Sequence, residues 1–222
     1  MTEHKDKNGN CKASRPALVA VTGGIGSGKS LVCRYLSEKG LFVLSADELS
    51  RMAVVPGTGA YDKIVDFFGD AVLLSDKTIN RPMLRRIIST DPEVKKTLEG
   101  FIHPEVFRQM AAQIDIATQR GEPLVVVEVP LLFEAGLEAW FDCVVLVSVA
   151  RERRIERIMA RDGVSREDAE AMMKIQMPER EKRSRCDFVI DNNDTEAVTR
   201  RSTEALYAYL VGRKYQKKNE NG

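Results

Sequence analysis

Residues 23–30 read Gly-Gly-Ile-Gly-Ser-Gly-Lys-Ser and match the pattern G-x-x-x-x-G-K-[ST]. Glycines in such a run permit backbone angles that turn successive N–H groups toward one centre, which forms a nest for an anion. The run follows an apolar stretch, residues 17–22, and precedes a segment with helical spacing, residues 28–40. A strand, a loop and a helix in this order are the context that the pattern requires. The sequence therefore predicts a phosphate-binding loop at the start of a helix.

The two last positions of the loop carry specific chemistry in this interpretation. Lys29 supplies a full positive charge for the β- and γ-phosphates of a nucleotide, and the hydroxyl of Ser30 ligates magnesium. The alternative is a glycine-rich turn that binds nothing, which the flanking strand and helix disfavour. The chain contains no N-K-x-D sequence that would read guanine. A short chain with a helical insertion (residues 48–120) and an arginine-rich segment (residues 151–185) is typical of a kinase for a small molecule.

Five short runs are apolar throughout rather than alternating, which is typical of strands covered on both faces of a parallel sheet. They span residues 17–22, 41–45, 124–129, 143–148 and 187–191. These runs lie within residues 16–47, 121–150 and 186–211, and the three ranges together are interpreted as a nucleotide-binding core. The fold class predicted is α/β.

Two of the gaps between strands have a character of their own. Residues 48–120 are too long for one crossover and predict several helices, with His103-Pro104 lying between two of them. Residues 151–185 hold 11 Lys and Arg against 8 Asp and Glu. This charged segment is either a solvated pair of helices with i,i+4 ion pairs or a lid that closes over bound phosphates.

Composition excludes several classes of protein. Lys and Arg number 34 against 33 Asp and Glu, a net charge of +1, so no nucleic-acid partner is indicated. No apolar run approaches the roughly 20 residues of a membrane span. The four cysteines are widely spaced, which favours reduced thiols and a cytoplasmic protein. Residues 1–15 and 212–222 are polar and are predicted to be disordered tails.

Two carboxylates follow predicted strands, where the ligands of such sheets bind. Asp47 comes after residues 41–45. It is interpreted equally as a cap of the next helix and as a functional group that accepts the proton of an acceptor hydroxyl, positions that hydroxyl or takes part in binding magnesium. Glu128 ends the run at 124–129 and is interpreted as a magnesium ligand, or else as a carboxylate bonded to neighbouring backbone.

An ordered set of short motifs resembles the dephospho-coenzyme A kinase family over residues 19–210. The motifs are T-G-G-I-G-S-G-K-S at 22–30, A-D at 46–47, P-G at 56–57, F-G at 68–69, R-x-x-L-R at 81–85, H-P at 103–104, V-P-L-L-F-E at 129–134, R-x-x-x-R-D at 157–162 and V-I-D-N-N at 189–193. The loop alone is shared by many kinases, whereas the whole set in this order is specific.

The resemblance implies a P-loop NTPase-like five-stranded parallel sheet flanked by helices, with a helical substrate-binding insertion (48–120) and a helical lid (151–185). It implies transfer of the γ-phosphoryl group of ATP to the 3′-hydroxyl of dephospho-coenzyme A, with Mg²⁺ as cofactor. ATP would bind at Gly24, Gly26, Ser27, Gly28, Lys29, Ser30, Leu31, Asn192 and Asn193. Catalytic roles fall to Asp47 as the general base and to Lys29, Arg157 and Arg161. The acceptor would meet Asp47, Arg81, Arg85 and His103, and the metal Ser30 and Glu128.

The sequence departs from the family pattern at two positions. Ser45 stands where the family commonly has an aspartate, so that carboxylate is lost as a metal ligand. Glu128 stands in place of another aspartate, which alters the reach toward magnesium. A kinase for another small molecule, such as a nucleoside monophosphate, and a non-enzymatic nucleotide sensor remain the alternatives. The expected assembly is a monomer or weak homo-oligomer.

Overall fold

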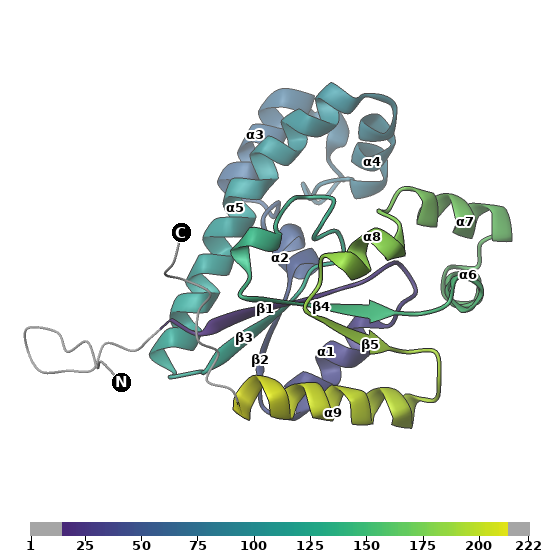
Figure 1. Ribbon diagram of the computed structural model, residues 1–222. Coiled ribbons are helices and arrows are strands. Elements are labelled where there is room, and N and C mark those ends of the chain that lie inside the picture. Colours follow the sequence, from purple (N-terminus) through teal and green to yellow (C-terminus); the bar gives the residue numbers. More distant parts are fainter. Residues whose placement is uncertain (1–14, 213–222) are drawn as a thin grey trace, which may run out of the picture. The chain divides into compact units, whose positions relative to one another are not determined.

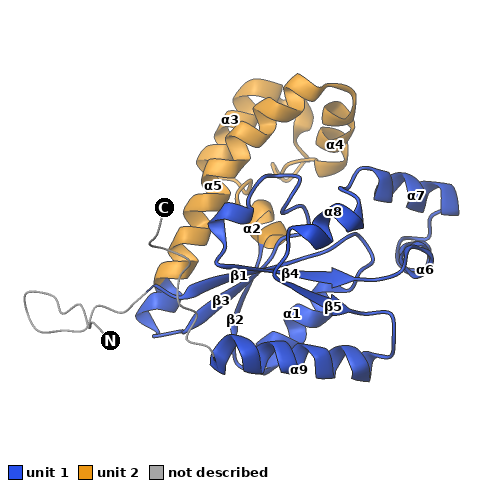
Figure 2. Cartoon of the chain, viewed as in Figure 1, with its two compact units in different colours: residues 1–45, 116–222 blue, residues 46–115 orange. Residues whose placement is uncertain are grey.

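The computed structural model describes residues 15–212, which form two compact units. The tails predicted at 1–15 and 212–222 lie outside the described residues, apart from Arg15 and Gly212. One unit joins the chain up to Ser45 with the chain from Ile116 onward, and the other comprises Ala46–Asp115 (Figure 2). The assignment of residues 48–120 to the substrate-binding insertion and of residues 151–185 to the lid stays a prediction.

The first unit is built on a parallel sheet with the strand order β2-β3-β1-β4-β5 (Figure 1). The strands are β1 (Ala17–Thr22), β2 (Phe42–Ser45), β3 (Leu124–Glu128), β4 (Cys143–Ser148) and β5 (Phe188–Asp191). The predicted five-stranded parallel sheet is thus confirmed, with three strand ends shifted by one residue. The register pairs Glu128 with Val21 on one side and with Ser45 on the other, so the ends of β1, β2 and β3 meet at one edge.

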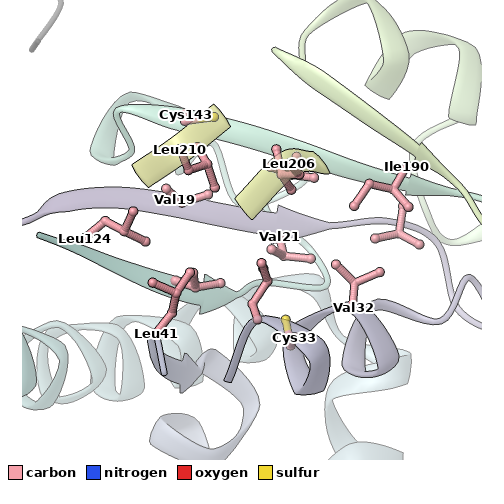
Figure 3. Packing of buried hydrophobic residues seen from close by; sticks show 14 residues of the cluster. Val19, Val21, Val32, Cys33, Leu41, Leu124, Cys143, Ile190, Leu206 and Leu210 are labelled. Atoms are coloured by element: carbon pink, nitrogen blue, oxygen red, sulfur yellow. The ribbon is translucent and has the colours of Figure 1, made fainter. Parts of the chain in front are cut away.

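Both faces of the central strands are buried, which explains why the strand sequences do not alternate. Val19 and Val21 of β1 pack with Val32 of α1 (Lys29–Glu38) and with Leu206 of α9 (Glu196–Gly212). Figure 3 shows these side chains coming together from the sheet and the two helices. The intervening residues Leu18 and Ala20 are buried as well. Burying this much apolar surface, at about 25 cal/mol per Å², is what holds the strands in place.

Three further helices and a short 3-10 turn complete the first unit. They are α6 (Arg151–Asp162), α7 (Arg166–Lys174), α8 (Glu179–Ser184) and the turn η2 (Glu138–Trp140). Helices α6 and α7 share a small core of Ile155, Ile158 and Ala169, against which Ile25 of the glycine-rich loop packs. Gly163, in the left-handed conformation, ends α6. The charged segment is therefore three helices, and the first of them packs on the loop.

The second unit is helical and has its own apolar core. Its elements are α2 (Ala46–Met52), α3 (Gly59–Phe68), the turn η1 (Asp70–Val72), α4 (Arg81–Thr90) and most of α5 (Pro92–Gln119). Ala53, Ile64, Val72, Leu84 and Leu98 form the centre of the core. Thr58 and Asn80 cap α3 and α4 by accepting N–H groups of the first turn.

The prediction that His103-Pro104 separates two helices is wrong, because α5 continues through both residues. A proline inside a helix removes one main-chain hydrogen bond and costs about 3 kcal/mol. Burial of Leu98 before the proline and of Met110 after it keeps both halves helical against that cost.

No helix within residues 15–212 is both long enough and apolar enough to cross a membrane.

Candidate active site

The glycine-rich loop lies between β1 and α1, and its shape depends on its glycines. Gly23, Gly26 and Gly28 have φ angles of 152°, 77° and 89°, which side chains rarely permit. A Cβ atom on Gly28 would lie 2.2 Å from Nδ2 of Asn192, and one on Gly23 would lie 2.5 Å from the carbonyl oxygen of Val147. The N–H groups of Gly26 and Gly28 have no hydrogen-bond partner within the described residues. They are free to bind an anion.

Lys29 is buried at the start of α1 and holds the first half of the loop. Its Nζ donates to the carbonyl oxygens of Gly23 and Gly24 at 3.0 and 3.1 Å. The first turn of α1 contains no acidic residue, so the positive end of the helix dipole is not neutralised there. Of the other predicted phosphate ligands, Ser27 and Leu31 already donate their N–H groups to the carbonyls of Gly24 and Gly28.

Ser30 and Glu128, the two predicted metal ligands, are in direct contact. The Oγ atom of Ser30 donates to Oε1 of Glu128 at 2.8 Å. A hydroxyl and a carboxylate side by side offer two oxygen ligands of the kind that Mg²⁺ takes alongside phosphates and water. Burial, and next the charge of Glu128, raise the pKa of the neighbouring thiol of Cys33, which is therefore neutral at pH 7.

The two predicted arginines of α6 differ in what they contact. Arg157 donates from Nη1 to the carbonyl of Gly26 at 3.3 Å and from Nη2 to the carbonyl of Asn192 at 3.1 Å. Arg161 is bound through Nε and Nη2 to both oxygens of Asp162, each at 2.7 Å, and its side chain is 60% exposed. Hydrogen bonding to Asp162 raises the pKa of Arg161. The structure thus brings Arg157 to the loop, and a role for Arg161 stays a prediction.

Asn192 and Asn193 hold the main chain around the loop. Asn192 is 2% exposed; its Nδ2 donates to the carbonyl of Ser27 at 2.8 Å, and its Oδ1 accepts from Thr199 at 2.7 Å. Oδ1 of Asn193 accepts the N–H of Ala150 at 2.7 Å, which links the segments after β4 and β5. Direct contact of these two asparagines with ATP stays a prediction.

The predicted acceptor residues belong to the second unit, with Arg81 and Arg85 at a common cavity. The cavity has a volume of about 150 Å³ and is lined mainly by apolar side chains, including those of Leu84 and Leu98. Arg81 donates to the carbonyl of Arg51 at 3.0 Å. Burial, and next the charges of Arg51 and Arg85, lower the pKa of Arg81. None of these three arginines has an ion pair within residues 15–212, so the cluster carries an uncompensated positive charge.

The other two acceptor residues are exposed. Asp47 lies in the first turn of α2, where a carboxylate is also favoured by the helix dipole. His103 lies within α5, with its ring 6.2 Å from that of Phe107. Their predicted roles as general base and acceptor ligand stay predictions.

Sequence reasoning missed several residues that contact the loop or fix its surroundings. Arg154, 7% exposed, donates from Nε to the carbonyl of Ile25 at 2.9 Å. Gln176 accepts the N–H of Ile25, and Lys182 forms a buried ion pair with Glu134 at 2.7 Å. Two of these residues had a signal in the sequence: Arg154 lies one helical turn before Arg157, and Glu134 ends the V-P-L-L-F-E motif at 129–134.

Comparison with known proteins places this arrangement in one family. The family model for dephospho-CoA kinase matches residues 17–197. The dephospho-CoA kinase of Syntrophotalea carbinolica is 41% identical over 87% of this chain and 92% of its own length. That of Geobacter sulfurreducens is 42% identical over 86% of this chain and 97% of its own length.

Solved structures share the fold of this chain, and one of them is a dephospho-CoA kinase. A crystal structure of a Thermus thermophilus protein has a TM-score of 0.78 at 35% identity, covering 89% of this chain and 99% of its own. The dephospho-CoA kinase of Campylobacter jejuni has a TM-score of 0.61 at 27% identity, covering 89% and 98%. A shikimate kinase from Acinetobacter baumannii, 17% identical with a TM-score of 0.52 and coverage of 90% and 96%, shares the fold alone. The chain belongs to the dephospho-CoA kinase family, whose members catalyse the final step of coenzyme A biosynthesis.

Proposed function

We propose that this kinase transfers the γ-phosphoryl group of ATP to the 3′-hydroxyl of the ribose in dephospho-coenzyme A, giving coenzyme A and ADP. The observation that carries the proposal is a loop already shaped for phosphates, with Lys29 at its base, in a chain matched by the family model over residues 17–197. Phosphoryl transfer depends mainly on positioning and on neutralising charge, so preformed geometry of this kind is what the reaction needs.

The first unit supplies the groups that bind the nucleotide. The free N–H groups of Gly26 and Gly28, the charge of Lys29 and the N-terminus of α1 attract the phosphates. Ser30 and Glu128 would hold Mg²⁺, which neutralises charge on the β- and γ-phosphates when bound. Arg157 contributes positive charge next to the loop, and residues 151–185 act as the lid that excludes water.

The second unit supplies the acceptor site in this proposal. The uncompensated charge of Arg81 and Arg85 suits the diphosphate of dephospho-coenzyme A, and the apolar cavity beside them suits the uncharged pantetheine arm. His103 contributes a further polar contact. Asp47 accepts the proton of the 3′-hydroxyl as that oxygen attacks the γ-phosphorus.

We further propose a cytoplasmic monomer or weak homo-oligomer with no nucleic-acid or membrane partner. The net charge of +1 supports the absence of a polyanionic partner. ATP and dephospho-coenzyme A are then the partners of this chain.

The test is a reaction with ATP, Mg²⁺ and dephospho-coenzyme A, followed by ³¹P NMR and mass spectrometry. We expect ADP and a product that carries a new phosphomonoester on the 3′-oxygen. Parallel reactions with nucleoside monophosphates test the closest alternative acceptor class. ADP formation with a nucleoside monophosphate and none with dephospho-coenzyme A would refute the proposal, as would nucleotide binding without transfer to any acceptor.

A further inference from the structure

Every carbonyl group of the loop from Gly23 to Ser27 accepts a side-chain hydrogen bond. Lys29 bonds the carbonyls of Gly23 and Gly24, Arg157 that of Gly26, and Asn192 that of Ser27. The remaining carbonyl, of Ile25, accepts from Arg154. A carbonyl held in this way cannot turn toward a bound phosphate, where its partial negative charge would repel the ligand. The side chains therefore preserve the orientation of the N–H groups that makes the loop an anion site.

Ile25 is held at both of its main-chain groups. Its carbonyl accepts from Nε of Arg154 at 2.9 Å, and its N–H donates to Oε1 of Gln176 at 2.8 Å. Nη2 of Arg154 lies 3.5 Å from the same Oε1 atom. The two side chains come from α6 and from the segment between α7 and α8. We call Arg154, Gln176 and Glu179 the Ile25 brace.

Arg154 is costly to bury, which makes its position informative. Burial lowers its pKa, and the charge of Glu179 opposes that change. Oε2 of Glu179 lies 3.4 Å from Nη1 of Arg154, while Oε1 of Glu179 accepts from the hydroxyl of Ser148 at the end of β4. A buried charge is tolerated only when it is paired and fully hydrogen-bonded. A Cβ atom on Gly24 would lie 2.1 Å from Nη2, so the guanidinium packs directly on the loop backbone.

We propose that Arg154 is a positioning residue for nucleotide binding. It acts with Gln176 to hold Ile25, and through Ile25 it keeps the loop in the conformation that binds the phosphates of ATP and ADP. Glu179 in turn holds Arg154 and ties the brace to the end of β4. The role rests on the proposed function only in taking a nucleoside diphosphate or triphosphate as the ligand of the loop. A loop that is already ordered loses less conformational entropy when it binds its ligand, and so binds it more tightly.

Isothermal titration calorimetry with ADP and Mg²⁺ tests the proposal, because ADP fills the loop without an acceptor. The variants are Arg154→Met, Arg154→Lys and Gln176→Leu, and Arg153→Met is the matched control, since Arg153 is an exposed neighbour on α6. We expect Kd for ADP to rise about 10-fold in Arg154→Met, the cost of one hydrogen bond to a charged group. Gln176→Leu should raise Kd about 3-fold for the loss of a neutral hydrogen bond. Arg154→Lys keeps the positive charge on a single donor nitrogen, so its Kd for ADP should lie between the values for Arg154→Met and the unmodified protein. The Kd of the Arg153→Met control should stay within about 2-fold of the unmodified value.

Steady-state kinetics separate positioning from direct catalysis. If Arg154 acts through the loop, KM for ATP rises with the ADP Kd in Arg154→Met while kcat stays within about 3-fold, the signature of uniform binding. A fall in kcat of about 100-fold at unchanged ADP affinity would instead place Arg154 on the transferring phosphoryl group and overturn the proposal.

Unchanged ADP affinity in an Arg154→Met variant whose melting curve shows that it is folded would also overturn the proposal. If that variant does not fold, Gln176→Leu alone decides, because unchanged ADP affinity there removes the brace. Lack of activity toward dephospho-coenzyme A would refute the proposed acceptor and leave the ADP titration intact.

Discussion

At the scale of single residues, Lys29 would combine two tasks in the proposed function. Its ammonium group holds the carbonyls of Gly23 and Gly24, and the same charge would attract the phosphates of the nucleotide. We expect Lys29→Ala to lower kcat/KM for ATP by about 100-fold or more, because charge and loop shape are lost together. Lys39→Ala is the control, since Lys39 lies at the other end of α1 and pairs with Glu204 at 2.9 Å. Near-normal activity of Lys29→Ala in a coupled ADP-release assay would contradict the assigned site.

The arginine cluster of the second unit permits a separate residue-scale prediction. Arg81→Met should raise KM for dephospho-coenzyme A by about 10-fold or more, since a hydrogen bond between two charged groups is lost. KM for ATP should not change, because that site belongs to the other unit. Arg86→Met, on the same helix but away from the cavity, is the matched control. Equal increases in both KM values, measured with the acceptor and ATP varied in turn, would show that Arg81 has no specific role toward the acceptor.

The residues that could be predicted from the sequence are those whose roles depend on local order along the chain. The positions of Lys29 and Ser30 follow from one contiguous motif between a strand and a helix. Arg154 and Gln176 contact Ile25 from 129 and 151 residues away, and no local pattern marks such pairs. The two predicted metal ligands, Ser30 and Glu128, each end a segment with a strong sequence signal, the loop and an apolar strand, and their role toward a metal stays a prediction.

At the scale of secondary-structure elements, α8 is fastened by a buried ion pair. The side chain of Lys182 is 1% exposed and lies 2.7 Å from Oε1 of Glu134, which also accepts the N–H of Met177. Burial raises the pKa of Glu134, but the ion pair with Lys182 and the hydrogen bonds from backbone N–H groups outweigh this effect and lower the pKa from its ordinary value of 4.5. The pair joins the segment after β3 to the helix that carries the end of the charged segment.

This ion pair predicts a pH dependence of stability. Because the pKa of Glu134 is lower in the folded than in the unfolded protein, its contribution is fully present above the ordinary value of 4.5 and is lost as the pH falls through the folded-state pKa. Glu134→Gln should lower the free energy of unfolding at pH 7 by about 3 kcal/mol, since it leaves a buried ammonium group unpaired. The difference from the unmodified protein should shrink below pH 4.5 in urea titrations. Glu181→Gln, an exposed change on α8, should cost less than about 0.5 kcal/mol.

A difference in the free energy of unfolding between Glu134→Gln and the unmodified protein that stays constant from pH 7 to pH 3 would contradict the role of the carboxylate charge.

Helix α5 is an element whose extent the sequence did not predict. Proline chemistry alone predicted a break at Pro104, whereas burial of Leu98 and Met110 keeps the helix continuous. Element boundaries that depend on tertiary packing are those that the sequence does not reveal.

At the scale of the whole molecule, two cores suggest two units of stability. Ile64 and Leu84 are buried among residues of the second unit, whereas Val19 and Val21 are buried in the sheet of the first. Units with separate cores open by separate local unfolding reactions, and a ligand stabilises only the unit whose opening destroys its site. ADP, bound at the loop, should therefore protect the first unit and leave the opening of the second unchanged.

Hydrogen exchange followed by mass spectrometry measures this difference. At an ADP concentration of about 100 times Kd, binding adds about 2.7 kcal/mol, so the slowest amides of β1 should exchange about 100-fold more slowly. Amides of α3 and α4 should change by less than about 3-fold, since their core can open while the loop stays intact. The Lys29→Ala variant, which should lose most ADP affinity, should show little protection in either unit and so controls for non-specific effects. Equal protection in both units would show that they unfold as one, because only a shared opening reaction passes stabilisation of the loop to helices with a core of their own.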